Sequence, residues 1–258
     1  MNTGNEYIKT EKKNEIGIIT LNKPEIKNIL DTKMLQELEK SLVVLGNDDR
    51  IRALIITGNK NFSAGADIKE FKEKHPEEAE VFSRLGHKIC NQIESMKKPV
   101  IAAVSGYALG AGCEIALACD LRVAGMSSKF GQPEVNLGLI PGFGGTQRLA
   151  RFVGFGRAKE LILSGRIIDA IEAGSIGLAN SVVDDDKLLE KAEEIGLILA
   201  QKSPLVMKIA KSLININLDM KKGLEMEMVS FSECFASQDH IEGINAFLEK
   251  RKPVFRGF

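Results

Sequence analysis

The sequence lacks the features of several large protein classes. Its four cysteines are scattered and include no CxxC pair, and its three histidines have no metal-ligand spacing, which argues against a disulfide framework or a zinc site. No apolar stretch approaches the roughly 20 residues of a transmembrane helix, and the N-terminal residues include no apolar signal core. We therefore expect a cytoplasmic protein with reduced cysteines, no metal and no membrane partner.

The chain also lacks net charge. Lysine plus arginine and aspartate plus glutamate each number 35, so no overall field attracts nucleic acid or an anionic membrane. An anionic ligand would have to meet a local patch of positive charge. The 258 residues include 44% hydrophobic residues and 24 glycines, which is typical of a globular protein with one large domain or two small ones.

Apolar periodicity predicts a mixed α/β protein whose C-terminal part is helical. Short β-branched runs predict strands at 16–21, 53–57, 100–104, 121–124 and 181–183. Apolar residues at steps of three and four predict helices at 32–45 with Asp31 as the cap, 77–96, 112–119, 187–201, 204–216 and 220–235. From about Gly144 onward, only 181–183 resembles a strand.

The helix predicted at 220–235 carries an apolar row, Leu224, Met228, Phe231 and Phe235. Such a row fits either a surface that joins subunits or packing within one chain. The sequence leaves both interpretations open.

Two glycine-rich turns carry the first chemical signal, 62–67 (FSAGAD) and 106–112 (GYALGAG). Small residues let a ligand approach the backbone, and N–H groups at a turn or helix N-terminus are fixed donors that can form an oxyanion hole. The simpler interpretation is a tight connection between strand and helix. Neither turn has the spacing of a phosphate loop or a dinucleotide fingerprint.

Two glutamates stand in apolar surroundings, Glu114 in GCEIALA and Glu134 in FGQPEV. Burying a carboxylate is costly, so both suggest general acid and base chemistry. The alternative is that they are exposed or cap a helix, where a first-turn acid is favoured by the helix dipole.

Four segments, in this order and spacing, resemble the crotonase (enoyl-CoA hydratase) superfamily: FSAGADIKE, GYALGAGCEIALACD, FGQPEVNLGLIPGFGGTQRL and AFLEKRKPVFRGF. The match spans nearly the whole chain. The resemblance implies a spiral of repeated β-β-α units over 1–195 that contains an acyl-CoA site. It also implies a helical region over 196–258 that builds a homotrimer or a dimer of trimers.

The resemblance also implies catalytic roles. The backbone N–H groups of Ala66 and Ala111 would hold the thioester carbonyl, and Glu114 and Glu134 would hold one water over the C2–C3 double bond. The implied reaction is reversible addition of water to a short trans-2-enoyl-CoA, with the C2 proton assigned to Glu134, although the acid and base roles of the pair stay open. No cofactor is implied, because coenzyme A is part of the substrate.

Further residues match positions that line the coenzyme and acyl sites in the family: Lys27, Ala64, Asp67, Ile68, Lys69, Gly142, Phe247 and Lys250. The last two match residues that reach a neighbouring subunit's coenzyme. Glu25 departs from the family pattern, in which many relatives carry a basic residue, and we expect Lys27 to take its place.

Two other functions are known among proteins that this sequence resembles. Family isomerases that move a double bond from Δ3 to Δ2 typically use one glutamate, so the pair favours a hydratase. A relative binds RNA through lysines on the first helix, where this chain has Lys33 and Lys40. Glu37 and Glu39 lie among them, so we expect a solvated face and no nucleic-acid partner.

Overall fold

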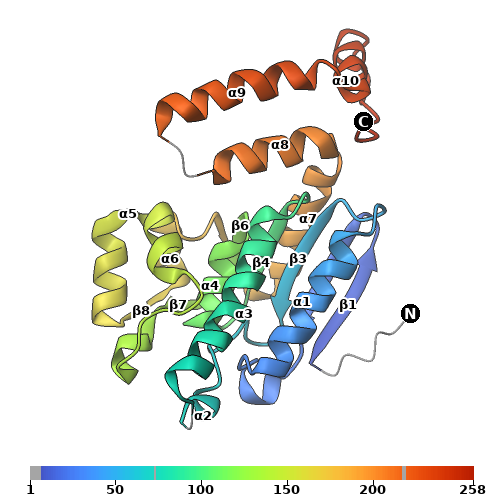
Figure 1. Cartoon of the computed structure of the whole chain (residues 1–258). Coiled ribbons are helices and arrows are strands. Elements are labelled where there is room, and N and C mark those ends of the chain that lie inside the picture. The colour runs from blue at the N-terminus through green and yellow to red at the C-terminus, as the bar shows by residue number, and fades with distance from the viewer. Residues whose placement is uncertain (1–6, 73, 217–218) are drawn as a thin grey trace.

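A six-stranded sheet forms the centre of the protein, whose computed structural model describes residues 7–72, 74–216 and 219–258 (Figure 1). Its strands, in spatial order, are β1 (Ile8–Lys13), β2 (Ile16–Leu21), β3 (Ala53–Gly58), β4 (Val100–Val104), β6 (Leu121–Gly125) and β9 (Ser181–Val183). β1 and β2 pair antiparallel, and all other neighbours pair parallel. All five strands predicted from the sequence are confirmed. β1 went unpredicted because it is a charged edge strand with a single buried residue.

A second, three-stranded sheet corrects two expectations. It consists of β5 (Tyr107–Leu109), β7 (Lys129–Gly131) and β8 (Ile167–Asp169). The turn expected at 106–112 therefore contains a strand, β5. The strand at 181–183 was expected to be the only one after Gly144, but β8 also lies in that part of the chain. Three residues are too few to show a period of two, so these strands had no sequence signal.

The predicted helices are confirmed to within a few residues. Asp31 caps the first of them, because its side chain accepts a hydrogen bond from the Met34 N–H at 2.7 Å. The helices are α1 (Thr32–Gly46), α2 (Ile68–Phe71), α3 (Pro76–Ser95), α4 (Ala111–Ala118), α5 (Gly145–Ser164), α6 (Ala170–Ser175), α7 (Leu188–Ala200), α8 (Pro204–Asn215), α9 (Met220–Cys234) and α10 (Gln238–Leu248). Short 3-10 turns occur at η1 (Pro24–Ile26), η2 (Pro133–Leu137) and η3 (Asp185–Lys187).

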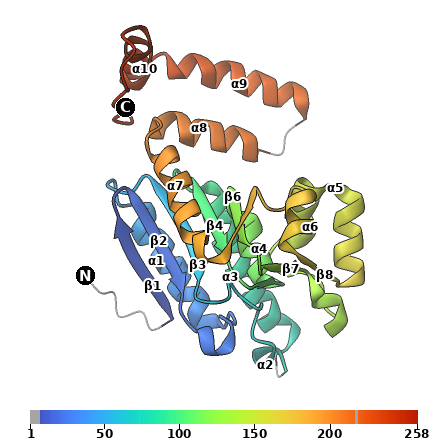
Figure 2. The ribbon, with the colours of Figure 1, turned by 180° about the vertical axis from the view of Figure 1, so that it is seen from behind.

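Helices cover both faces of the main sheet, with α1 and α3 on one side and α7 on the other (Figures 1 and 2). Alternate residues of β3 show the division, because Leu54 and Ile56 belong to the large core under α1 and α3, whereas Ile55 belongs to a smaller core with Leu188 and Ala192 of α7. Parallel strands that are buried on both faces read as continuous apolar runs, which explains why these strands were predictable.

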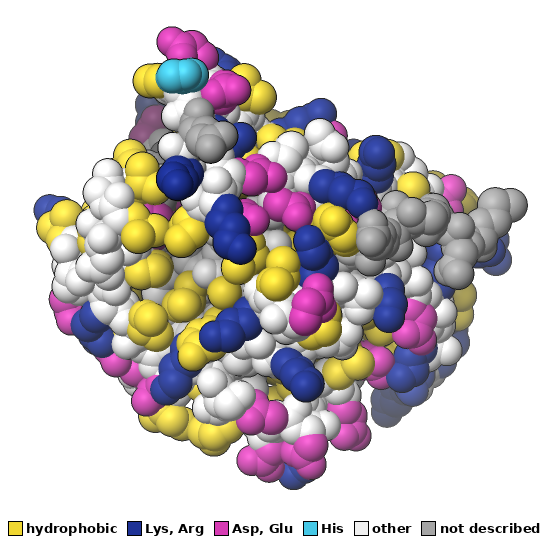
Figure 3. All heavy atoms as spheres, turned by 90° about the horizontal axis from the view of Figure 1, so that it is seen from below, with side chains coloured by type: hydrophobic (Ala, Val, Ile, Leu, Met, Phe, Trp, Pro, Cys, Tyr) yellow, Lys and Arg dark blue, Asp and Glu magenta, His cyan; other side chains and the backbone are white. Residues whose placement is uncertain are grey.

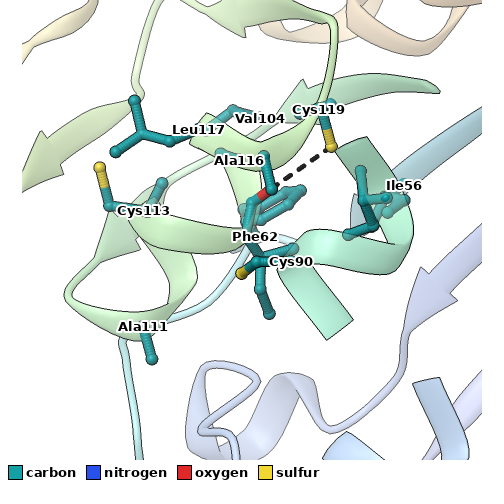
Figure 4. Close-up of a cluster of buried hydrophobic side chains, with 14 of the residues drawn as sticks. Ile56, Phe62, Cys90, Val104, Ala111, Cys113, Ala116, Leu117 and Cys119 are labelled. Atoms are coloured by element: carbon teal, nitrogen blue, oxygen red, sulfur yellow. Dashed lines mark hydrogen bonds between the residues drawn. The ribbon is translucent and has the colours of Figure 1, made fainter. Parts of the chain in front are cut away.

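Three cysteines are packing residues of the large core (Figure 4). Cys90, Cys113 and Cys119 are buried free thiols, and Cys234 is a partly buried free thiol. Burial raises the pKa of each of the three core thiols. The Cys119 thiol donates to the Ile115 carbonyl at 3.4 Å. The prediction that the cysteines are packing residues is confirmed for Cys90, Cys113 and Cys119.

The solvated face expected on α1 is confirmed at Lys33 and Lys40, which are exposed, but Glu37 between them is buried. Glu37 is 8% exposed, and its carboxylate accepts hydrogen bonds from the N–H groups of Tyr7 (2.9 Å) and Ile8 (3.2 Å). The carboxylate thus binds the beginning of β1 to α1, a contact between distant segments that helix periodicity does not contain.

The last three helices, α8 to α10, extend together from one end of the sheet domain (Figure 1). Lys211 joins α8 to that domain, because its Nζ donates to Asp120 Oδ2 (2.7 Å) and to two backbone carbonyls.

The domain boundary expected between residues 195 and 196 falls inside α7, which packs against the sheet. No helix in the described part of the chain is long and apolar enough to span a membrane.

Candidate active site

A cavity of about 330 Å³ opens between the two glycine-rich turns, α2, the start of α3 and η2. Seen from below, hydrophobic side chains gather around a hollow, and Lys and Arg side chains lie around it (Figure 3). The structure brings these predicted site residues to its wall: Ala64, Ala66, Ile68, Ala111, Glu114, Glu134 and Gly142.

The two glycine-rich turns lie side by side because their backbones pair. The Ser63 N–H donates to the Tyr107 carbonyl (2.7 Å), and the Leu109 N–H donates to the Ser63 carbonyl (3.0 Å). On the other side, the Leu30 N–H donates to the Gly65 carbonyl (2.8 Å), and the Asp67 N–H donates to the Leu30 carbonyl (3.0 Å). The Gly65 carbonyl and the Asp67 N–H therefore face Leu30, on either side of Ala66.

Ala66 and Ala111 both line the cavity, and for two different reasons we expect their N–H groups to face it. Backbone groups alternate sides along an extended segment, so the Ala66 N–H faces away from Leu30. Ala111 is the first residue of α4, where N–H groups have no partner within the helix and carry the positive end of its dipole. Gly110 before it has φ +50°, and a Cβ there would lie 3.1 Å from Glu134 Oε1. The turn therefore needs glycine to approach that carboxylate.

Glu114 is 1% exposed and is held by backbone donors from a distant loop. Its Oε1 accepts hydrogen bonds from the N–H groups of Phe143 and Gly145, both at 2.7 Å. Burial raises the pKa of Glu114, while these two N–H groups and the Arg148 charge act in the opposite direction and stabilise the ionised form. Gly145 begins α5, so the carboxylate also lies at a helix N-terminus, where negative charge is favoured.

Glu134 lies on η2 in a drier setting than an ordinary surface carboxylate. Burial and, to a smaller extent, the negative charge of Glu114 raise its pKa to about 7. Gln132 is completely buried beside it. When Glu134 is ionised, the amide orientation that satisfies both groups places the Gln132 nitrogen toward the carboxylate, where it donates to Oε1 (2.9 Å) and Oε2 (3.2 Å) of Glu134. Both glutamates thus lie beside one cavity, and burial raises the pKa of each.

The remaining wall is mostly apolar, and Lys74 and Ser83 are its polar members. Phe82 contacts Phe71 and Phe143, with ring centroids 5.2 and 5.4 Å apart. Ser83 fixes the loop beside them, because its hydroxyl donates to the Gly142 carbonyl at 2.6 Å. The other apolar residues of the wall come from α2, α3 and η2 or its following loop: Ile68, Ala79, Leu137, Leu139 and Ile140.

Five predicted site residues do not line this cavity. Asp67 caps α2 by accepting from the Lys69 N–H at 2.9 Å. Lys27 is close by, since its carbonyl accepts from the Ala64 N–H (2.9 Å) and its ammonium lies 4.8 Å from the Tyr107 ring centre. The other two, Phe247 and Lys250, lie on or just after α10, far from the α2 end of the same chain (Figure 1).

Sequence reasoning missed three residues of the site, Gln132, Phe143 and Gly145. Gln132 lies two residues before Glu134, but the neighbouring sequence does not show that its amide is buried and bonded to that carboxylate. The backbone donors of Phe143 and Gly145 carry no signal in their side chains. Within the described ranges, no cluster of His, Cys, Asp or Glu is arranged to hold a metal ion.

The fold and the site define an α/β protein with two glutamates and two glycine-rich turns at the wall of one largely apolar cavity. The chain belongs to the enoyl-CoA hydratase/isomerase family, whose model matches residues 11–257.

Named relatives agree with this placement. The chain is 44% identical over 246 residues to the short-chain-enoyl-CoA hydratase of Clostridium acetobutylicum, covering 94% of each chain. It is 44% identical over 254 residues to the crotonyl-CoA hydratase of Syntrophomonas wolfei, covering 97% of this chain and 98% of the relative. The crystal structure of an enoyl-CoA hydratase from Bacillus anthracis superposes with a TM-score of 0.94 at 38% identity, covering 98% of this chain and 100% of the other. The predicted crotonase fold is therefore confirmed.

Proposed function

We propose that this chain is an enoyl-CoA hydratase that adds water reversibly to short trans-2-enoyl-CoA esters. The observation that carries the proposal is the presence of Glu114 and Glu134 in one apolar cavity with the turns of Ala66 and Ala111. The names of the relatives from Clostridium and Syntrophomonas support a short acyl chain.

The environments of the two glutamates support distinct roles. Glu134, with a pKa raised to about 7 by burial, holds a proton near neutral pH and gives it to C2. Glu114, whose ionised form is stabilised by two backbone donors, takes a proton from water as the water oxygen bonds to C3. Water is consumed, the C2–C3 double bond becomes single, and the pair exchanges protonation states. Dehydration reverses the same steps.

Ala66 and Ala111 supply the second part of the mechanism. Attack at C3 moves electron density onto the thioester oxygen, which becomes enolate-like before C2 is protonated. Two fixed N–H donors stabilise that charge more than they stabilise the neutral carbonyl, so they lower the barrier. The thioester, two carboxylates and two N–H groups complete this chemistry, and we propose no cofactor beyond the coenzyme A of the substrate.

We assign the binding of the coenzyme portion to two parts of a homo-oligomer, the cavity region of one subunit and the C-terminal region of its neighbour. Ala64, Ile68 and Gly142 lie at the cavity, and Lys27, Asp67 and Lys69 lie beside it. We assign Phe247 and Lys250, which lie far away in the same chain, to the coenzyme site of a neighbouring subunit in a trimer or dimer of trimers. The division into a core at 1–195 and an oligomerisation region at 196–258, and a location in the cytoplasm, belong to the same proposal.

Hydration of crotonyl-CoA tests the function directly. We expect rapid loss of the enoyl-thioester absorbance with the wild-type chain and loss of that activity in Glu114→Ala. Glu134→Gln is expected to keep substrate binding and reduce turnover by orders of magnitude. If both variants hydrate normally, the proposal is wrong. If the wild type binds crotonyl-CoA without hydrating it and converts a 3-enoyl-CoA to the 2-enoyl product, the chain is an isomerase instead.

A further inference from the structure

Arg148 is a buried cation that the proposed mechanism does not use. Its side chain is 8% exposed, and it leaves the first turns of α5 toward the loop that holds Glu114. Long charged side chains are rarely buried unless their donors are satisfied by specific partners. The partners of this guanidinium therefore indicate what it does.

One end of the guanidinium holds the loop at 143–145. Nη1 donates to the Phe143 carbonyl at 2.7 Å, and the N–H of the same residue donates to Glu114. Gly144 gives the cation room, because a Cβ at that position would lie 2.2 Å from Nη1 of Arg148. Gly144 also has φ +107°, which side-chain-bearing residues rarely adopt.

The other end of the guanidinium is anchored on α3. Nη2 donates to Glu94 Oε2 at 2.7 Å and to Asn91 Oδ1 at 2.9 Å. A continuous series of contacts thus runs from Glu94 through Arg148 and the Phe143 backbone to the carboxylate of Glu114. The Ser83 hydroxyl and the Phe82 ring hold the same loop from α3, and the guanidinium adds a charged anchor directly beside the two N–H groups, where a catalytic group must be fixed to within about 0.5 Å.

We propose that Arg148 is a positioning residue, which fixes the loop at 143–145 so that its two N–H groups hold Glu114 in the orientation that activates water. This inference rests on the proposed hydratase function for its kinetic consequence. Its structural content, the order of the loop, does not depend on the reaction.

The positive charge of Arg148 also favours the ionised form of Glu114, in addition to the hydrogen bond by which Arg148 holds the loop. Burial raises the pKa of Glu114, and the positive charge of Arg148 opposes that increase. The other titratable groups that face this pair come from η2 and α3: Glu134, His87, Cys90 and Glu94. Loss of the cation should therefore move the protonation of Glu114 to higher pH, a change that a merely structural residue would not produce.

Arg122 provides a matched control. Its guanidinium is 1% exposed, and it donates to the carbonyls of Cys119 (2.7 Å) and Leu178 (2.7 Å). It is therefore a second buried arginine bound to backbone carbonyls, at the C-terminal end of α4, whereas Glu114 is in the first turn of that helix. Loss of either arginine should destabilise the fold, but only loss of Arg148 should release the loop.

The test compares Arg148→Met and Arg148→Lys with Arg122→Met and Arg122→Lys. Hydrogen exchange of the peptide segment 142–147 is expected to be faster in the Arg148 variants and unchanged in the Arg122 variants. We expect Arg148→Met to lower kcat for crotonyl-CoA by roughly 10- to 100-fold, the effect of losing a charge-assisted hydrogen bond, with KM nearly unchanged. The acidic limb of its kcat/KM profile should move up by about one pH unit, and Arg148→Lys should recover part of both effects.

The outcomes separate the two proposals. Unchanged exchange at 142–147 together with a wild-type pH profile in Arg148→Lys would overturn the positioning role, even if Arg148→Met does not fold. Equal kinetic losses in the Arg148 and Arg122 variants would also overturn it, since a shared stability defect would then explain both. If the wild type does not hydrate crotonyl-CoA, the proposed function fails, and the exchange experiment still decides whether Arg148 orders the loop.

Discussion

Gln132 donates its side-chain N–H to Glu134, 2.9 Å from Oε1, in a position where Gln132 itself is completely buried. The bond stabilises the carboxylate that forms when the proton of Glu134 passes to C2. It therefore becomes stronger as the reaction proceeds, which is the condition for an interaction to raise kcat.

Replacing Gln132 with methionine, which keeps the length of the side chain, should reduce kcat for crotonyl-CoA hydration. A hydrogen bond to a charged group contributes about 1.5–3 kcal/mol, which corresponds to roughly 10- to 100-fold in rate. Gln147→Met is the matched control, because the Gln147 side chain is exposed and donates to the neighbouring Thr146 hydroxyl rather than to Glu134. Equal kcat values for the two variants would show that Gln132 has no catalytic effect.

The pH dependence of the reaction should reflect Glu134. A carboxyl whose pKa is raised to about 7 keeps its proton below that pH and loses it above, so an acid role for Glu134 predicts that kcat/KM falls as pH rises through 7. Because the overall reaction releases no proton, hydration and dehydration should show the same limb. Rates in both directions between about pH 5.5 and 9 provide the measurement. A profile that stays flat to pH 9 would assign the proton to another group.

Gly86 of α3 is expected to be irreplaceable because Phe143 packs against it. A Cβ at Gly86 would lie 2.1 Å from the Phe143 ring, so Gly86→Ala must displace the ring and the loop that holds Glu114. Overpacking of this kind typically costs about 1–3 kcal/mol of stability, and kcat should fall with it.

Gly156 of α5 is the control for that substitution. A Cβ there would meet nothing within 4 Å, so Gly156→Ala should stabilise the helix by about 0.5–1 kcal/mol without a change in kcat. Urea denaturation followed by circular dichroism measures the change in unfolding free energy of both variants, and the crotonyl-CoA assay measures kcat. Similar stabilities for the two variants would mean that the contact at Gly86 relaxes without cost.

The apolar row on α9 should join subunits. Met228, Phe231 and Phe235 are 65%, 66% and 54% exposed, and an isolated subunit would expose all three to water. Met228→Glu with Phe231→Glu should lower the mass measured by sedimentation from an oligomer to a monomer. It should also raise KM, because Lys250 would no longer reach a neighbouring coenzyme site. Glu227→Lys on the same helix controls for charge, and an unchanged mass in the double variant would show that this row does not join subunits.

Local sequence patterns predicted much of the fold for a physical reason. The strands at 53–57 and 100–104 are continuous apolar runs because both of their faces are buried, and α1 begins where Asp31 can accept from the N–H of Met34. These properties depend on residues within one or two turns of each other. The short strands β5, β7 and β8 escaped prediction because their pairing, not their own composition, makes them strands.

By itself, the sequence determined which residue types the site would contain: two carboxylates in apolar segments and two glycine-rich turns. Only the tertiary structure decided their electrostatic states. Phe143 and Gly145 reach Glu114 across 29 and 31 residues of chain, and Arg148 and Gln132 have partners that no local period marks. A side chain's identity is encoded at its own position, whereas its burial, its hydrogen-bond partners and therefore its pKa depend on which distant segments pack against it.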